Sequence, residues 1–153
     1  MLKAKDIMTR DVITIRPDAT VEELARLLIE HKISGVPVID ESDRLIGIVT
    51  ENDLIRQNKR LHIPTIIRLF DAYIVLGSGR MEDEIKRMVA TTVGEICTRD
   101  VITVNEDATI EEIATIMSER NVHLIPVLKD GRLVGIIGKA DVVGAMTGEA
   151  NKQ

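Results

Sequence analysis

Thr50, Asn52 and Asp53 are the residues in this chain whose types and spacing suggest chemistry, within the run of residues 47–53. A strand is expected to end at Thr50 and a helix to begin at about Glu51, so that backbone amides with partial positive charge face outward and favour an anion. The Thr50 hydroxyl can donate to a phosphate oxygen. The Asp53 carboxylate would repel phosphate, but it can accept from both hydroxyls of a ribose. Together these preferences describe a nucleoside phosphate.

The same spacing also has a purely structural interpretation. Thr50 at the N-cap and Asp53 three residues later are typical of a helix cap, in which side chains satisfy the unpaired amides of the first turn. Two features favour a ligand: Gly47 stands just before the pattern, and the carboxylate recurs as Asp141 in a second copy of it.

The whole pattern belongs to an internal duplication, because residues 7–54 return as residues 96–142. Identical pairs include Thr9/Thr98, Asp11/Asp100, Thr14/Thr103, Glu22/Glu111, Pro37/Pro126, Gly47/Gly135 and Asp53/Asp141. One repeat of about 48 residues is near the lower limit for burying an adequate core by itself. The two copies are therefore expected to pack as one two-fold-like object with clefts between its halves.

Each repeat is expected to form an extended segment, a helix, two strands and a second helix. Thr20 with Glu23, and Thr109 with Glu112, are capping boxes that begin the first helices. The apolar faces of these helices follow a 3.6-residue period and should be buried: Val21, Leu24, Ala25 and Leu28 in one, Ile110, Ile113, Ala114 and Met117 in the other.

Polar turns at residues 40–44 and 130–132 divide the strand pairs, which are predicted to be antiparallel hairpins. The second helices should begin at about Glu51 and Lys139. Gly47 and Gly135 lie inside strands, where glycine usually marks the close approach of another backbone or a ligand. Cys97 aligns with Met8, so the two side chains should fill equivalent apolar volumes.

A long connection, residues 55–95, joins the repeats. Within it, residues 81–90 are expected to form a further helix, because Met81, Ile85, Met88 and Val89 share one face. Its acidic start and basic later turn complement the helix dipole. So apolar a connection favours packing on the repeats or a contact in a dimer.

The combination of a DVITI-type strand, a capped helix, an SGVPVID strand and a GIVTENDL strand–helix junction resembles a cystathionine β-synthase (CBS) domain. Two copies resemble a CBS-domain pair, and the match spans nearly the whole chain. The resemblance implies an α/β (α+β) fold of two βαββα repeats packed with pseudo-two-fold symmetry. The expected organisation is CBS repeat 1 at 1–60, a connecting segment with a helix at 61–90, CBS repeat 2 at 91–148 and a tail at 149–153.

CBS-domain pairs commonly bind AMP, ADP, ATP or S-adenosylmethionine in clefts between the repeats. One repeat supplies the ribose carboxylate, and the other supplies most of the adenine pocket. The resemblance thus implies a first site joining Thr50, Asn52 and Asp53 to Val101, Ile102, Val122, His123, Leu124 and Pro126. The implied second site joins Gly138, Lys139 and Asp141 to Val12, Ile13, Ser34, Gly35, Val36 and Pro37.

The second site departs from the family pattern at Gly138, where Thr or Ser is usual, and so lacks one phosphate donor. Gly138 is expected to keep its backbone amide available, and Lys139 can supply charge. Two clefts of unequal affinity are expected, or one functional cleft beside a vestigial one. His123 stands where the family often has a basic phosphate contact. Arg10 and Arg99 are candidates for phosphate or subunit contacts as well as for solvated surface.

The composition weighs against several other classes of function. A net charge of −5 and an aromatic content of 1% argue against nucleic-acid binding through basic patches or aromatic stacking. The three histidines and the single Cys97 have no metal-ligand spacing, and one cysteine fits a reducing compartment. No apolar run approaches the length of a membrane span, and no signal peptide is evident. A cytoplasmic protein is expected.

The leading interpretation is a regulatory, energy-sensing module that binds an adenine nucleotide and is not an enzyme. It would need no obligatory cofactor, would form a homodimer, and would act on an unknown protein in trans. An S-adenosylmethionine sensor and a ligand-independent protein-interaction scaffold are the alternatives. An enzyme of adenylyl chemistry is a third, for which the sequence offers no base or metal cluster.

Overall fold

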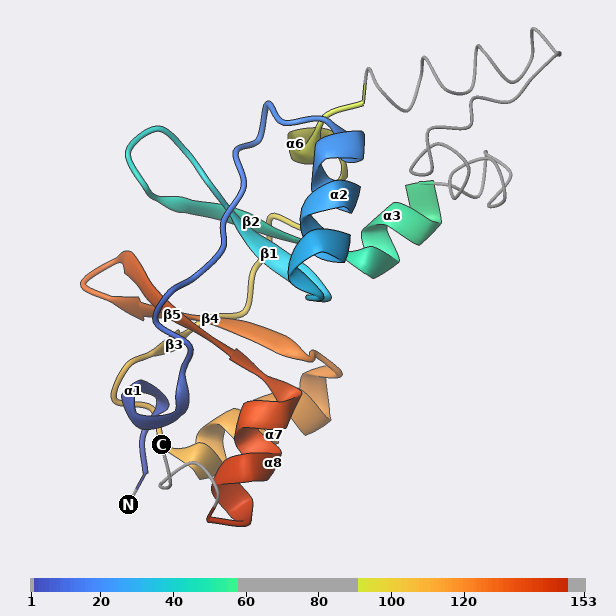
Figure 1. Cartoon of the computed structure of the whole chain (residues 1–153). Coiled ribbons are helices and arrows are strands. Elements are labelled where there is room, and N and C mark those ends of the chain that lie inside the picture. The colour runs from blue at the N-terminus through green and yellow to red at the C-terminus, as the bar shows by residue number, and fades with distance from the viewer. Residues whose placement is uncertain (1, 58–90, 149–153) are drawn as a thin grey trace, which may run out of the picture. The chain divides into compact units, whose positions relative to one another are not determined.

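The computed structural model describes residues 2–57 and 91–148. In chain order, its elements are α1 (Ala4–Ile7), α2 (Val21–His31), β1 (Gly35–Ile39), β2 (Leu45–Thr50), α3 (Glu51–Gln57), α6 (Val93–Ile96), β3 (Val104–Asn105), α7 (Ile110–Arg120), β4 (Leu124–Lys129), β5 (Arg132–Gly138) and α8 (Lys139–Met146) (Figure 1). The expected helix at 81–90, the remainder of the segment 61–90 and the tail at 149–153 lie outside the described residues.

Both repeats contain the expected extended segment, helix, strand pair and second helix, and each begins with a short helix, α1 or α6, that was not predicted. In the second repeat, β3 pairs in parallel with β4, with Val104 opposite Val127, and β4 pairs antiparallel with β5. In the first repeat, β1 and β2 pair, and Ile15 forms a parallel bridge with Val38 where the second repeat has β3. The mixed α/β (α+β) class is confirmed, and both second helices begin at the expected residues.

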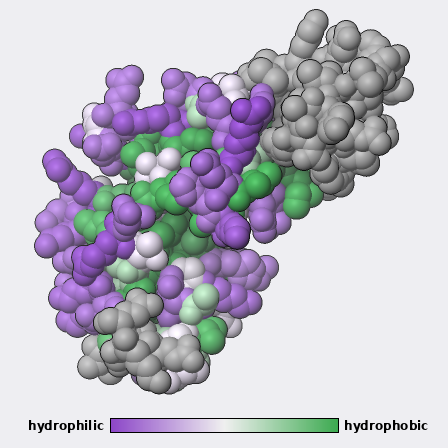
Figure 2. Space-filling view, in the orientation of Figure 1, coloured by the Kyte–Doolittle hydropathy of each residue, from purple (hydrophilic) through white to green (hydrophobic). Residues whose placement is uncertain are grey.

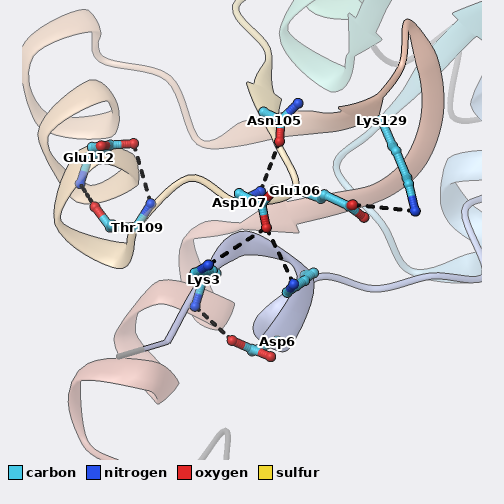
Figure 3. Close-up of polar contacts among 9 residues, drawn as sticks. Lys3, Asp6, Asn105, Glu106, Asp107, Thr109, Glu112 and Lys129 are labelled. Carbon is cyan, nitrogen blue, oxygen red and sulfur yellow. Dashed lines mark hydrogen bonds and ion pairs between the residues drawn. The ribbon is translucent and has the colours of Figure 1, made fainter.

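The two longest helices begin at the predicted capping boxes. At α2, the Glu23 amide donates to the Thr20 hydroxyl at 3.1 Å, and the Thr20 amide donates to the Glu23 carboxylate at 3.0 Å. At α7, Glu112 and Thr109 make the same two hydrogen bonds at 3.2 and 3.3 Å (Figure 3). Each box satisfies two amides that the helix itself leaves unpaired.

The predicted apolar face of α2 is buried along its whole length, comprising Val21, Leu24, Ala25 and Leu28. On α7, Ile113 is fully buried. The other three predicted residues of α7 are partly buried and pack against the same core cluster. Burial of these faces removes apolar surface from water and holds each helix on its strands.

The described residues form two compact units, and each unit combines parts of both repeats. The α8 unit contains residues 2–13, 41–45 and 100–148. The α3 unit contains residues 14–40, 46–57 and 91–99. Each repeat's core is therefore completed by the opening segment of the other repeat.

In the α8 unit, α1 buries Ala4, Ile7 and Met8 in the core cluster of the second repeat, and Figure 1 draws α1 in blue beside β3 and β5. Thr9 and Ile136 exchange backbone hydrogen bonds of 2.9 and 3.0 Å. Lys3 and Lys5 form ion pairs with Asp107, before α7, at 3.8 and 3.3 Å. Figure 3 shows Lys3 beside Asp107.

In the α3 unit, α6 makes the matching contacts with the first repeat. Val93 is fully buried, and its amide donates to the carbonyl of Ala19 at 2.8 Å. Thr98 and Ile48 exchange two backbone hydrogen bonds of 2.9 Å each. The same anchoring device is therefore built twice.

The two strand glycines lie beneath these opening segments. A Cβ on Gly47 would lie 2.8 Å from the Thr98 carbonyl oxygen and 2.9 Å from the Cys97 sulfur. A Cβ on Gly135 would lie 2.7 Å from Cγ of Met8. The predicted close approach is confirmed, and Met8 and Cys97 take equivalent places over their glycines. Within the described part of the chain, no helix is both long and apolar enough to cross a bilayer.

Candidate functional site

The first strand–helix junction is organised around the carboxylate of Asp53. The Thr50 amide and hydroxyl donate to its Oδ2 at 2.8 and 3.3 Å, and Arg56 Nη2 donates to its Oδ1 at 3.1 Å. Its side chain is only 7% exposed, and Asp53 is the one buried charged residue in the described part of the chain. Because charge is costly to bury, these three hydrogen bonds offset the loss of water around the carboxylate.

The backbone amides of this junction are less open than the sequence suggested. The Thr50 amide donates to Asp53, and the Glu51 amide donates to the Ser34 carbonyl at 2.8 Å. An anion therefore cannot use these two amides without displacing a protein acceptor. The Thr50 hydroxyl is the more adaptable donor, because its 3.3 Å hydrogen bond is long and the hydroxyl can rotate.

The second junction repeats the arrangement with fewer polar groups. The Gly138 amide donates to Oδ2 of Asp141 at 2.7 Å, and the Lys139 amide donates to the His123 carbonyl at 3.1 Å. The expectation that Gly138 keeps its amide available is wrong, because Asp141 already accepts from it. The Lys139 side chain is exposed, so its charge is the adaptable group here.

The contact between junction carboxylate and amide is a general feature of the helix starts. In all six described helices, the third helical residue accepts from the amide of the residue before the helix. The pairs are Lys3–Asp6, Thr20–Glu23, Thr50–Asp53, Thr92–Glu95, Thr109–Glu112 and Gly138–Asp141. The capping interpretation of Asp53 is therefore confirmed, and its burial is what sets it apart.

The predicted site residues are divided between the two units. The α3 unit holds Thr50, Asn52, Asp53, Ser34, Gly35, Val36 and Pro37. The α8 unit holds Val101, Ile102, Val122, His123, Leu124, Pro126, Val12, Ile13, Gly138, Lys139 and Asp141. Each unit thus carries the junction of one predicted site and base-lining residues of the other.

Within each unit, a predicted lining residue contacts the strand–helix junction of the same unit. Ser34 accepts from the amide that begins α3, and His123 accepts from the amide that begins α8. Among the predicted lining residues, Val36, Pro37 and Pro126 are fully buried. Ser34, His123, Asn52 and Lys139 are exposed. These four exposed side chains can reach a ligand without repacking of the core.

Arg56 was not identified from the sequence as a site residue. Its signal was the spacing of three residues from Asp53 along a helix, which places the two side chains on one face. The other two conspicuous arginines have structural contacts: Arg10 donates to the Lys5 carbonyl and Arg99 to the Gly94 carbonyl, each at 2.9 Å. These two equivalent contacts close the short helices α1 and α6.

Cys97 is a partly buried free thiol, and Asp53 of the first junction is among the charges that act on it. Burial raises the pKa of the Cys97 thiol, Arg99 lowers it by its positive charge, and Asp53 raises it by its negative charge. A raised pKa leaves less thiolate, so this cysteine is poorly suited to nucleophilic chemistry. No cluster of three metal-ligating side chains occurs within residues 2–57 and 91–148.

A model of the CBS domain matches residues 4–59 and 93–148. The matches cover more than half of the chain, which therefore belongs to the CBS domain family. Inosine-5′-monophosphate dehydrogenase from Methanocaldococcus jannaschii is 31% identical over 142 residues. The aligned region is 92% of this chain and only 23% of the dehydrogenase, so the similarity concerns one part of that enzyme.

Two solved structures are similar over almost the entire chain. The CBS domain pair of protein MJ0100, in complex with 5′-methylthioadenosine and S-adenosyl-L-methionine, has a TM-score of 0.72 and 29% identity, covering 97% of this chain and 98% of that one. CBSX2 of Arabidopsis thaliana, in complex with AMP, has a TM-score of 0.74 and 24% identity, with both chains fully covered. At that identity, the second likeness concerns the fold.

Proposed function

We propose that this protein is a regulatory module that binds an adenosine-containing ligand and has no catalytic activity of its own. The observation that carries the proposal is Asp53, a carboxylate 7% exposed at a strand–helix junction that recurs as Asp141. The adenosine ligands held by the similar MJ0100 pair support it. AMP, ADP and ATP are the leading ligands, and S-adenosylmethionine is the alternative.

In the proposed arrangement, the two junction carboxylates accept hydrogen bonds from ribose hydroxyls. Thr50 and Asn52 serve the first ligand beside Asp53, and Lys139 serves the second beside Asp141. The remaining contacts of each ligand would come from the predicted base-lining residues named above. A ligand bound this way regulates only to the extent that it favours one arrangement of the protein over another.

Calorimetry and thermal unfolding with AMP, ADP, ATP and S-adenosylmethionine test the proposal. A ligand present at about 100 times its dissociation constant should stabilise the fold by about 2.7 kcal/mol. For a chain of this size, that corresponds to a rise in melting temperature of about 5 to 11 °C. Absence of heat and of any melting shift for the whole series would contradict the proposal.

The variant Asp53→Ala should weaken binding at the first junction by about 10- to 100-fold, because it removes a charged hydrogen-bond acceptor. It also removes a helix cap, so a matched control is needed. Glu23→Ala removes the equivalent carboxylate cap of α2 in the same unit. Equal losses of affinity in both variants would show that the effect of Asp53 is only structural.

Self-association is a second proposed property, supported by exposed apolar side chains. On α8, Val143 is 53% exposed and Met146 is 71% exposed, three residues apart on one helix face. On α3, Ile55 is 55% exposed. Figure 2 also shows apolar surface, in green, among polar residues on the face that it draws. Groups of exposed apolar residues are typical of protein contacts.

Light scattering after gel filtration tests whether the exposed apolar residues of α8 form a homodimer contact. The wild-type chain should have twice the monomer mass, and the double variant Val143→Glu, Met146→Glu should shift towards the monomer. If ligands do not bind but a protein partner is retained by a chain lacking both the Asp53 and the Asp141 carboxylates, the scaffold alternative would replace the regulatory one.

The cytoplasmic location stays a prediction.

A further inference from the structure

The two junction carboxylates differ in how many protein groups already occupy them. Asp53 accepts from the Thr50 amide, the Thr50 hydroxyl and the Arg56 guanidinium. For Asp141, the described residues provide one donor, the Gly138 amide to Oδ2 at 2.7 Å, and none to Oδ1. The difference comes from two positions, because glycine stands in the second repeat where Thr50 and Arg56 stand in the first.

We infer that Arg56 is an internal competitor for the ribose hydroxyls at the first junction, and that Gly144 leaves the second junction open to them. The inference rests on the proposed function. It makes the second junction the less obstructed ribose acceptor, although the sequence assigns the weaker phosphate contacts to that same junction. Ribose recognition and phosphate recognition are thereby favoured in opposite repeats.

The geometry of the Arg56 contact explains why it competes but does not block. Arg56 is 67% exposed and reaches Oδ1 of the buried Asp53 at 3.1 Å. Oδ2 is held by the backbone amide that caps α3, so Oδ1 is the oxygen left for a ligand. An ion pair with so exposed an arginine is weak, because solvent and side-chain entropy oppose it. A diol can therefore displace Arg56 into solvent at a modest cost in affinity.

The second junction also has room for the missing competitor. Gly144 stands three residues after Asp141, as Arg56 stands three residues after Asp53. A Cβ placed on Gly144 meets no atom within 4 Å. An arginine can therefore be introduced there without a clash at its first carbon, which allows a reciprocal exchange between the repeats.

The experiment measures adenosine binding by calorimetry. Adenosine carries no charge. Removing the positive charge of Arg56 should therefore change adenosine affinity mainly through the contact between the junction carboxylate and the two ribose hydroxyls. In a chain carrying Asp141→Ala, the variants Arg56→Ala and Arg56→Gln should each bind adenosine about two- to fivefold more tightly. In a chain carrying Asp53→Ala, Gly144→Arg should weaken adenosine binding by a similar factor.

Arg26→Ala is the matched control, because Arg26 is 65% exposed and makes an equivalent ion pair with Glu22 on α2, at 2.6 Å. It should leave adenosine affinity unchanged. Melting curves of each variant confirm that it is folded, and Arg56→Gln keeps most of the aliphatic stem without the charge if Arg56→Ala unfolds. Unchanged or weaker adenosine binding in both Arg56 variants would overturn this inference alone. A wild-type chain that binds no adenosine compound would overturn the proposed function, and this inference with it.

Discussion

The carbonyl oxygen of Thr98 lies 2.8 Å from the point that a Cβ on Gly47 would occupy. Thr98 belongs to the segment that opens the second repeat, whereas Gly47 lies in β2 of the first. Glycine at this position is what allows the two backbones to approach, because any larger residue would push them apart. The contact joins the opening segment of one repeat to a core strand of the other.

Gly47→Ala should lower the free energy of unfolding by about 1 to 3 kcal/mol, because the added methyl group meets a backbone oxygen that cannot rotate away. Urea denaturation provides the measurement. Gly144→Ala is the control: a Cβ there meets nothing within 4 Å. Gly144 lies in the last turn of α8, so the change should raise stability by only about 0.5 kcal/mol. Equal stability of Gly47→Ala and wild type would contradict the close approach.

Ile7→Ala should destabilise the second repeat although Ile7 belongs to the opening segment of the first. Ile7 is 8% exposed in the cluster that contains Ile125 and Ile137. Loss of its side chain should cost about 2 to 5 kcal/mol through lost burial and a cavity. Hydrogen exchange should show faster exchange of the amides of β4 and β5. Faster exchange confined to β1 and β2 would mean that α1 packs on its own repeat.

Lys32→Asn should stabilise the protein. Lys32 ends α2 with φ of 54°, in the left-handed region, where a side chain with a Cβ and no local hydrogen bond is strained. Asn121 has the same conformation at the end of α7. The change should raise the free energy of unfolding by about 1 kcal/mol, and Asn121→Lys should lower it by a similar amount. Thermal and urea unfolding would measure both, and changes of the same sign would contradict the prediction.

The alkylation rate of Cys97 should report the charges around its thiol. The pKa of Cys97 is raised by burial, lowered by Arg99 and raised by Asp53. Asp53→Asn should therefore lower the pKa, increase the thiolate fraction and speed the reaction with iodoacetamide at about pH 8. Arg99→Gln should raise the pKa and slow the reaction.

Glu23→Gln should leave the Cys97 rate unchanged, since Glu23 is not among the groups that shift this pKa. The rate should be followed from about pH 7 to 10, because a shift in pKa moves the midpoint of the profile whereas a loosened structure raises the rate at every pH. A profile of Asp53→Asn with an unmoved midpoint would contradict the electrostatic assignment.

Features that depend on neighbouring residues were predictable from the sequence. The capping boxes at Thr20 and Thr109 form as expected, since a cap joins residues three positions apart. The buried face of α2 follows from its helical period. The strand glycines and the equivalence of Met8 with Cys97 followed from comparing the two repeats. The cap at Asp53 was also predictable, though its burial was not.

Contacts between distant residues were decided only by the tertiary structure. The pattern of the repeats does not reveal that α1 completes the second repeat's core, because an apolar face does not specify which strand will cover it. Nor could it show that the carbonyls of Ser34 and His123 accept the first amides of α3 and α8.

The sequence by itself determined the duplicated elements and the carboxylates at their junctions, because both depend on the spacing of residues that are close together in the chain. Which oxygen of each carboxylate remains open depended on the folded chain. A hydrogen bond needs two atoms within about 3 Å at a suitable angle. Arg56 reaches Asp53 at that distance, and the second repeat has a glycine in its place.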